Sequence, residues 1–432
     1  MKISLQILSA ISFAGIALLN AATSPEVLDY ETVIQLARAN NYAIQQAEAQ
    51  LEEAEGRSMT ARAGRLPAVD LVASYSRIDE NRLETFGGSA FGDSQSWSAD
   101  IQATQPLYTG GAVTSSIRGT RAAQSSAEAQ FNQTLQDAML AVHQSWYAVL
   151  LAREEVVVRA ASIELLQKQL KQAEDRFETG SVSRFDLLRA EVALANGRPP
   201  YIRAQNQYRL TIVDLLQVLG LEAPAGTDPE IEGELVYAPL EMDLAEALSI
   251  AKQNRPEFLS LDKLIEASEA EVKGAKAGYL PNLNLVAGYG VQKSNFSDEL
   301  DDTVEGWTVG VQGSWRIWDA KATKGSVLSA RSRLRQSELA RDELDLQVGT
   351  EVRQALSSIQ EAKELVESSR KVVEQAEEVL SLAEDRYSVG SAIQLEVLEA
   401  QLSLTEARTN EVQALHDYSL AAVRLERALG TL

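Results

Sequence analysis

The sequence contains no cysteine, only two histidines and few aromatic residues, and each shortage removes a class of protein. Without cysteine there is no disulfide scaffold and no thiol to carry a lipid anchor. The histidines, His143 and His416, have no neighbouring set of ligands, so no metal site or catalytic constellation is recognisable. No nucleophile, metal set or acid/base pair indicates an enzyme, and the sequence implies no cofactor.

Basic residues are also in short supply. The chain has 40 basic and 62 acidic residues, a formal net charge of -22, which argues against binding to nucleic acid. Aromatic residues make up 6% of the chain and there are ten prolines. The residues that dominate instead are Ala, Leu, Glu, Gln, Arg and Ser, a composition typical of long helices.

The N-terminus reads as an export signal. One lysine precedes roughly 17 apolar residues, and small residues with Pro25 follow. This pattern predicts a signal peptide over residues 1–21. A membrane anchor, the alternative, needs about 20 apolar residues and basic flanks. No later segment has 18 consecutive apolar residues, so we expect an exported protein without a membrane-spanning helix.

The chain repeats itself. Residues 173–194, "AEDRFETGSVSRFDLLRAEVAL", return at 383–404 as "AEDRYSVGSAIQLEVLEAQLSL", and residues 61–75 return at 275–289. The spacing changes within polar, glycine-containing stretches, as expected of loops. We therefore predict an internal duplication, with a first repeat over 22–220, a linker over 221–242 and a second repeat over 243–432.

Each repeat contains a long helical pattern. In the second, apolar or small residues recur at alternating spacings of four and three from Val352 to Tyr387, and no proline interrupts residues 320–388. This period of about 3.5 predicts a left-handed coiled coil, and the rod would be on the order of 100 Å long. The first repeat shows the same seam from Val142 to Phe177. Gly180 and Gly390 are expected to end the long helices, with a second, antiparallel helix returning from each.

Each repeat also contains two segments that alternate apolar and polar residues, predicting hairpins over 68–107 and 282–316. Aromatic residues lie near the strand ends: Trp97, Tyr108, Trp307, Trp315 and Trp318. One apolar face, one polar face and aromatic rims are typical of a transmembrane β-barrel, although a soluble hairpin on a core has the same alternation. Four strands cannot close a barrel. Two chains would give eight strands filled by side chains, and three would give twelve with a lumen.

Taken together, the signal sequence, repeats, paired hairpins and glycine-ended tips resemble the outer-membrane efflux protein family, the TolC-like channels. "QPLYTGG", residues 105–111, is similar to the family's strand-to-helix junction. The resemblance implies an α+β membrane protein. Its homotrimer would close a 12-stranded barrel in outer-membrane lipid, four strands per chain, continuous with a periplasmic coiled-coil tunnel. It also implies a passive exit duct for an inner-membrane pump and a periplasmic adaptor.

The resemblance assigns roles at the helix tips. Glu396 and Glu399 share one helix face and match the acidic positions that narrow the family's periplasmic entrance. Asp186 corresponds to Glu396 in the first repeat and is assigned to the entrance with them. A solvated helix face is the alternative. Tyr387 and Asp186 match an entrance latch. The family's latch arginine corresponds to Ala392 here, so the second link of the latch is absent unless Arg184 replaces that arginine.

Two functions compete at this stage. A duct explains both the long helices and the hairpins, whereas a non-channel periplasmic scaffold or adaptor explains only the helices. The sequence does not name the cargo, which in drug efflux or in type I protein secretion is selected by the pump.

Overall fold

The computed structural model describes residues 27–79, 84–86, 89–91, 94–223, 228–294 and 299–432. The predicted signal peptide, residues 1–21, lies outside these residues. Contacts divide the chain into two compact units. Unit 1 comprises the described residues up to Tyr42 together with 138–241 and 357–424, and unit 2 comprises 43–137, 242–356 and 425–432. Among the described helices, none is both long and apolar enough to cross a bilayer.

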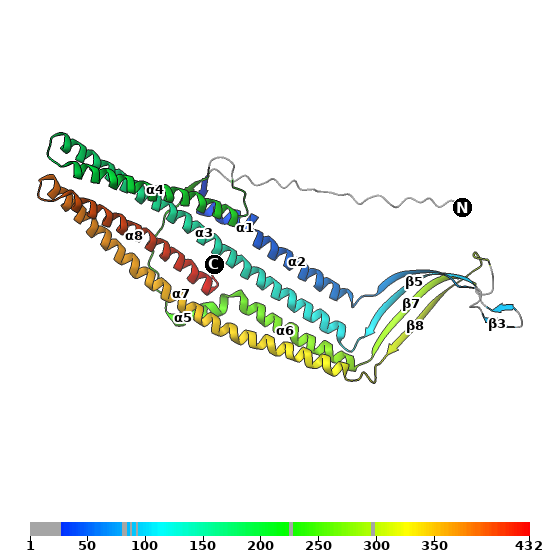
Figure 1. The fold of residues 1–432 in the computed structure, drawn as a ribbon. Helices are drawn as coiled ribbons and strands as arrows, with labels where there is room; N and C mark the ends of the chain where they lie inside the picture. The colour runs from blue at the N-terminus through cyan, green and yellow to red at the C-terminus, as the bar shows by residue number, and fades with distance from the viewer. Residues whose placement is uncertain (1–26, 80–83, 87–88, 92–93, 224–227, 295–298) are drawn as a thin grey trace. The chain divides into compact units, whose positions relative to one another are not determined.

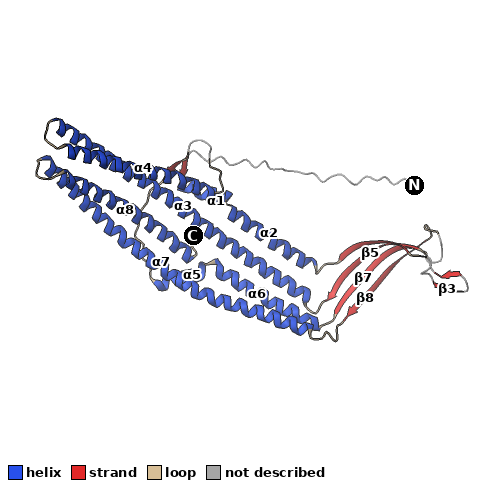
Figure 2. Ribbon diagram, viewed as in Figure 1, coloured by secondary structure: helices blue, strands red, loops and turns tan. Residues whose placement is uncertain are grey.

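The two halves of the chain contain the same succession of elements: two helices, two strands of one sheet, a long helix and a returning helix (Figures 1 and 2). In the first half these are α1 (Tyr30–Asn40), α2 (Tyr42–Ala63), β2 (Ala68–Arg77), β5 (Gln95–Tyr108), α3 (Ala112–Glu178) and α4 (Arg184–Val218). In the second they are α5 (Leu244–Asn254), α6 (Pro256–Lys276), β7 (Asn282–Lys293), β8 (Thr303–Ser314), α7 (Ala322–Ser388) and α8 (Gln394–Leu429). The short strands are β1 (Val27–Asp29), β3 (Glu84–Phe86), β4 (Ser89–Phe91) and β6 (Glu230–Glu232).

The predicted long helices are confirmed, and α3 and α7 each contain 67 residues. On α7 the predicted seam is buried at most positions, including Val352, Val366 and Leu380. The first repeat departs from the prediction near its tip: Phe177 is 40% exposed, whereas its counterpart Tyr387 is 6% exposed. The two seams are therefore alike in sequence but not in burial, and the difference is greatest where the long helices end.

Four helix ends share one cap. Gly180, Gly220, Gly390 and Gly430 all have positive φ, between 73° and 78°. At each end the glycine N–H bonds to the carbonyl three residues before it, and the next N–H bonds to the carbonyl five residues before itself. Glycine is favoured because the left-handed conformation crowds a Cβ atom. The predicted helix stops at Gly180 and Gly390 are confirmed, and α4 and α8 end in the same way.

The surroundings of these glycines differ enough to be tested. A Cβ on Gly430 would lie 2.7 Å from the Arg255 backbone nitrogen, whereas one on Gly180 would meet nothing within 4 Å. Gly180→Ala therefore carries only backbone strain, about 1–2 kcal/mol. Gly430→Ala has the same strain and adds a clash with backbone, so we expect it to lose about 1–3 kcal/mol more than Gly180→Ala. Thermal unfolding of both purified variants checks the ranking, and equal melting temperatures would contradict it.

Unit 2 contains a four-stranded antiparallel sheet in the order β2-β5-β7-β8. Strands β2 and β5 form the first predicted hairpin, β7 and β8 form the second, and the β5–β7 pairing joins them. Among the described residues, β2 and β8 each pair on one side only. The sheet therefore has two open edges within a single chain.

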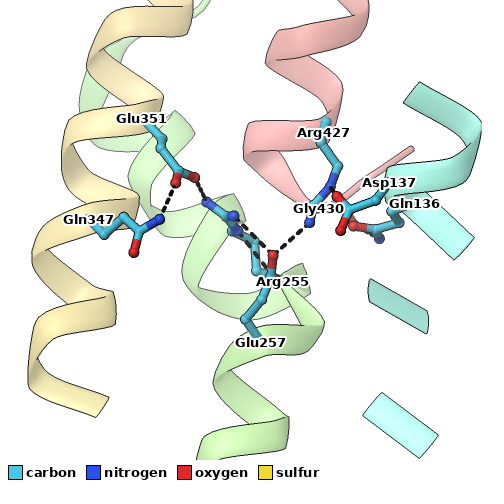
Figure 3. A network of polar contacts seen from close by, with 8 residues as sticks. All are labelled: Gln136, Asp137, Arg255, Glu257, Gln347, Glu351, Arg427 and Gly430. Carbon is cyan, nitrogen blue, oxygen red and sulfur yellow. Dashed lines mark hydrogen bonds and ion pairs between the residues drawn. The ribbon is translucent and has the colours of Figure 1, made fainter. Parts of the chain in front are cut away.

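The helices of unit 2 meet at a buried ionic network (Figure 3). Glu257, at the start of α6, accepts hydrogen bonds from Arg255 at 3.0 and 3.3 Å and from Arg427 of α8 at 2.7 Å. Arg255 also pairs with Glu351 of α7, and Arg427 with Asp137 of α3. The side chains of Arg255, Glu257 and Arg427 are 6–10% exposed. Charges buried this deeply are costly unless they are paired, so these contacts fix α3, α6, α7 and α8 to one another.

In unit 1 the segment between the halves is held at several points. Its strand β6 pairs in parallel with β1, and Arg153 of α3 donates to the carbonyls of Ile231 and Gly233. Further along, the Tyr237 and Tyr418 rings meet edge to face at 4.8 Å between centroids. The predicted linker is thus a fixed part of unit 1 where the structure describes it.

Candidate functional site

The sheet of unit 2 has one continuous apolar face. Directly paired residues in neighbouring antiparallel strands point to the same side, so the register decides which side chains gather. Two rows cross all four strands: Val69, Ala103, Ala287 and Val309, and then Leu71, Ile101, Tyr289 and Trp307. Leu71 is 73% exposed and Trp307 76% exposed. The predicted apolar face is confirmed, and within the single chain it is uncovered.

The opposite face carries the polar residues. One row joins Asp70, Gln102, Gly288 and Thr308, and Ser74 pairs with Ser98 with their hydroxyl oxygens 2.9 Å apart. This separation of apolar from polar side chains suits a sheet with an apolar environment on one side and a polar one on the other. The structure thus places apolar side chains on one side and hydrogen-bonding groups on the other.

The predicted aromatic residues lie at both ends of the strands. Trp97 and Trp307 lie in the half of the sheet next to the loops, whereas Tyr108, Trp315 and Trp318 are near the end that leads into the long helices. The indole N–H of Trp97 donates to the Leu300 carbonyl at 2.9 Å, and that of Trp315 to the Tyr279 carbonyl at 3.2 Å. Each of these two side chains therefore combines an apolar body with a satisfied polar group, the combination that suits a membrane–water interface.

Unit 2 also has a hollow of about 1390 Å³ between α2, α3, α6 and α7. Alanine, serine and glycine dominate its lining. The charged residues of the lining form two ion pairs, Glu53 with Arg57 and Glu271 with Arg333. The hollow is therefore lined mainly by small side chains and carries no excess charge of either sign.

The predicted entrance acids lie at the tips in unit 1. Asp186 is at the third position of α4, where its carboxylate accepts from the backbone N–H and the hydroxyl of Ser183, at 3.1 and 2.7 Å. Glu396 occupies the equivalent position of α8 and pairs with Arg386 at 3.1 Å. A carboxylate at this position stabilises a helix start. Both acids thus have a local structural role, whereas Glu399 is exposed one turn further on.

The predicted latch between Tyr387 and Asp186 is not formed within this chain. The carboxylate of Asp186 accepts a hydrogen bond from the Ser183 hydroxyl instead, and Arg184 is an exposed residue at the start of α4. The Tyr387 hydroxyl is buried and has no hydrogen-bond partner among the described residues. Its ring instead lies under the guanidinium of Arg176, 4.3 Å from centroid to Cζ.

Arg176 is the tip residue that the sequence interpretation missed. Its Nη1 donates to the Tyr387 carbonyl at 3.2 Å and its Nη2 to the Ser388 carbonyl at 3.3 Å. The one signal in the sequence is the dipeptide Asp-Arg that both tips share, at 175–176 and 385–386. Nothing in the spacing shows that one arginine crosses to the other tip and its counterpart does not.

The histidines take part in helix packing. His143 is buried, with Nε2 2.6 Å from the Tyr30 hydroxyl and Nδ1 2.8 Å from the Met139 carbonyl. Burial lowers the pKa of His143, which favours the neutral ring. His416 contacts Asp417 at 2.9 Å. In the described part of the chain, no cluster of three or more His, Cys, Asp or Glu residues is placed to hold a metal ion.

Comparison with known proteins identifies two matches to one family within the chain. A family profile described as "Outer membrane efflux protein" matches residues 33–221 and, separately, 247–431. Together these stretches cover most of the chain.

Individual relatives agree with that profile. Protein CyaE of Bordetella pertussis is 26% identical over 400 residues, which cover 92% of this chain and 83% of CyaE. The alkaline protease secretion protein AprF of Pseudomonas aeruginosa is 24% identical, over 90% of this chain and 82% of AprF. Among solved structures, the Campylobacter jejuni CmeC outer membrane channel superposes with a TM-score of 0.80 at 18% identity, covering 93% of this chain and 85% of CmeC.

Proposed function

Because this chain belongs to the outer membrane efflux protein family, we propose that three copies form an exit duct, with a 12-stranded barrel in the outer membrane and a helical tunnel in the periplasm. The observation that carries the proposal is the sheet: one uncovered apolar face, one polar face and two open edges. A soluble scaffold of long helices gives no reason for an uncovered apolar face of four strands.

Closure of the barrel follows from the cost of open edges. Backbone groups that face lipid without partners cost several kcal/mol each, so β2 of one copy must pair with β8 of the next. Two copies would give eight strands, a barrel filled by its own side chains, whereas three give twelve and leave a lumen. A duct needs the lumen, so we favour the trimer.

The internal repeats suit the same assembly. We propose that repeats 22–220 and 243–432, joined by 221–242, arose by duplication, with each supplying one hairpin of the barrel and one helical hairpin of the tunnel. The matched order of elements and the two separate family matches support this. Transport is then passive: the chain supplies a path and no catalytic step.

Members of the family work with an adaptor and an inner-membrane pump. We propose the same arrangement here, with the helix tips facing the adaptor. Val389 is 78% exposed, Phe185 64% and Ile393 61%, so each tip presents apolar side chains at its end. The name of AprF refers to protease secretion, whereas that of a second relative, OpmQ of Pseudomonas putida, refers to pyoverdine export. The cargo here is therefore either a secreted protein or a small molecule delivered by the pump.

We propose that Glu396 and Glu399 line the periplasmic entrance. Three chains would bring six carboxylates together, a ring that favours cations. We expect the wild-type protein in planar bilayers to form low-conductance, cation-selective channels. The double variant Glu396→Ala/Glu399→Ala is expected to conduct more and to select cations less.

Glu396 also pairs with Arg386, so the single variants separate two effects. Glu399→Ala should reduce cation selectivity while leaving the start of α8 intact, and Glu396→Ala should in addition loosen that helix start. If Glu399→Ala has the conductance and ion selectivity of the wild type, Glu399 does not line the constriction. A wild-type protein that forms no channel would contradict the duct itself.

A further inference from the structure

We propose that the turns joining the sheet of unit 2 to its helices form a binding surface for anionic phospholipids of the periplasmic leaflet. This inference rests on the proposed duct, because it requires the sheet to lie in the outer membrane. Four turns make up the surface: 64–67 after α2, 109–111 after β5, 277–281 after α6 and 315–321 after β8. All four belong to unit 2.

The four turns lie side by side at the end of the sheet that meets the helices (Figure 1). The Gln105 side chain donates to the Arg65 carbonyl at 2.9 Å, which joins the first turn to β5. A Cβ on Gly110 would lie 2.8 Å from the Leu280 Cβ, so the second turn packs on the third. The hydrogen bond from the Trp315 indole, described above, joins the fourth turn to the third. The turns therefore form one continuous strip.

This strip is basic, although the whole chain has a formal net charge of -22. Within the four turns and the adjoining helical turns there are seven basic residues, and Asp319 is the one acid. The seven, called the basic collar below, are Arg62, Arg65, Lys273, Lys276, Arg316, Lys321 and Lys324. All seven are exposed, and none forms an ion pair with any residue that the structure describes. The collar thus offers positive charge to a partner outside the chain.

Helix stability does not explain the lysines before α7. The start of a helix carries partial positive charge, so a cation placed there is unfavourable. Lys321 directly precedes α7 and Lys324 lies in its first turn. Asp319 already accepts hydrogen bonds from two backbone N–H groups of this helix start. The two lysines therefore add only repulsion to the isolated chain, and an anionic ligand would turn that repulsion into attraction.

Large apolar side chains are exposed beside these charges. Trp315 is 60% exposed, Ile317 83% and Trp318 81%, all in the same turn as Arg316. In the neighbouring turns, residues such as Leu66 are exposed as well, at 64%. Side chains with apolar bodies suit the boundary of the acyl chains, and basic groups among them can reach the phosphates. The mixture matches a phospholipid headgroup better than water alone.

The length of the strands places the collar at headgroup depth. Strand β8 has 12 residues, which is about 40 Å of extended chain. A tilt of about 40° reduces this to about 30 Å across the membrane, the thickness of the hydrocarbon core. With the loops of the sheet at the outer surface, the turn that follows Ser314 reaches the periplasmic headgroups.

The two ends of the sheet carry opposite charge. The described loop residues at the far end, in 78–79, 84–86, 89–91, 94, 294 and 299–302, include five acids and no lysine or arginine. The collar at the near end has six more basic residues than acids. Anionic lipids would therefore be attracted to the collar and not to the loops.

A second copy of the chain would not cover this surface. In the proposed barrel, β2 of one copy pairs with β8 of the next, so neighbouring copies extend the strip at its two ends. The outward side of the strip then faces the membrane in every copy. Because three copies bring like charges into one ring, the assembly itself increases the need for anions. A phospholipid of net negative charge supplies both the phosphate and the acyl chains.

Quenching of tryptophan fluorescence by brominated phospholipids tests the inference. The protein is reconstituted into vesicles of phosphatidylcholine and phosphatidylglycerol, with bromine on the acyl chains of one lipid or the other. For the wild type, we expect phosphatidylglycerol to bind at least about fivefold more strongly, the effect of one cation at an anionic surface. Arg316→Gln/Lys321→Gln/Lys324→Gln should reduce this preference to less than about twofold.

Arg121→Gln/Arg331→Gln/Arg353→Gln is the matched control. It removes the same charge from exposed positions on α3 and α7 of the same unit, away from the turns. It should keep the preference of the wild type. Equal losses in the two triple variants would show that only the total charge matters, and a collar variant that keeps the preference would show that the collar does not bind lipid. Either result would overturn the inference.

Two further measurements do not depend on this comparison. Raising the salt concentration should weaken the wild-type preference, because screening acts on exposed charges. A preference that salt does not change would overturn the inference. In native gels the collar variant should still migrate as the wild type does. If it separates into single chains, the collar joins copies of the chain instead of binding lipid.

Conductance in planar bilayers separates this inference from the duct. A wild-type protein that conducts without any lipid preference would keep the duct and overturn the inference. A protein that prefers phosphatidylglycerol but never conducts would support the collar and contradict the duct. Quenching by neither brominated lipid would overturn both, because the sheet would then not lie in the membrane.

Discussion

Glu257→Gln is expected to lower the free energy of unfolding by about 3 kcal/mol, because two buried arginines lose the carboxylate that they share. The amide oxygen of glutamine still accepts one hydrogen bond, and Glu351 and Asp137 remain in place. The loss is therefore placed at the lower end of the range for broken buried ion pairs. Thermal unfolding of the purified protein, followed by circular dichroism, measures it.

Glu271→Gln provides the control for this prediction. Glu271 pairs with Arg333 in the same unit, but the two side chains are 48% and 51% exposed. Exposed pairs contribute about 0–1 kcal/mol, so this variant should melt close to the wild type. If both variants lose the same free energy of unfolding, burial does not explain the contribution of the Glu257 network to stability.

The same network predicts how stability depends on pH. Burial alone would raise the pKa of Glu257, but hydrogen bonds from Arg255 and Arg427 outweigh it and hold the pKa below the usual value. A lowered pKa contributes stability above the pKa of the unfolded state, about 4.3, and that contribution is lost as the pH falls through the folded value. Below about pH 4, wild-type stability should therefore fall more steeply than that of Glu257→Gln.

Ile101→Arg is expected to prevent membrane assembly, whereas Gln102→Arg next to it on β5 should be tolerated. Both side chains are exposed in the single chain, so a soluble protein would accept both changes. In the proposed barrel, Ile101 would face lipid and Gln102 would face the lumen. A charge on the lipid face near the bilayer midplane costs about 2–4 kcal/mol.

Membrane fractionation followed by native gel electrophoresis in detergent reads out both variants. Wild type and Gln102→Arg should require detergent and migrate as trimers, while Ile101→Arg should appear as monomer or be degraded. Two variants with the same distribution would contradict the assignment of the two faces, whichever way they behave.

Much of this architecture could be predicted because it depends on periodicity. A spacing of 3.5 specifies the seam of α7, an alternation of two specifies the faces of β2 and β8, and glycine marks the helix ends at Gly180 and Gly390. These signals are local, so each is legible without knowing what packs against it.

Contacts between residues that lie far apart in the sequence could not be predicted. Arg255, Glu257 and Arg427 look like surface charges in the sequence, because only the folded chain brings the start of α6 to the end of α8. Their counterparts in the first repeat, Asn41, Ala43 and Gln217, carry no charge. Comparison of the two repeats therefore does not predict the ionic network.

The turns before the long helices could be predicted only in part from the sequence. Gly110 and Gly111 take positive φ before α3, as glycines readily do. In the second repeat the same conformation falls on Ala320 and Lys321, with φ of 51° and 74°. Asp319 supports this strained turn by accepting from the N–H groups of Lys321 and Thr323. Alignment of the repeats locates the turn, but propensity alone would not have placed it on alanine and lysine.

The equal length of α3 and α7 limits how such a chain can change size. Deleting one residue from α7 would turn every later side chain by about 100° and remove it from the seam. Deleting seven keeps the phase to within about 20°, but withdraws Tyr387 from Arg176 by about 10 Å. The contact between Tyr387 and Arg176 is kept only if α3 also loses seven residues. Helices α4 and α8 must then shorten by the same length, because they return from the same tips. Homologues with shorter or longer tips should therefore differ by whole heptads, in all four helices at once.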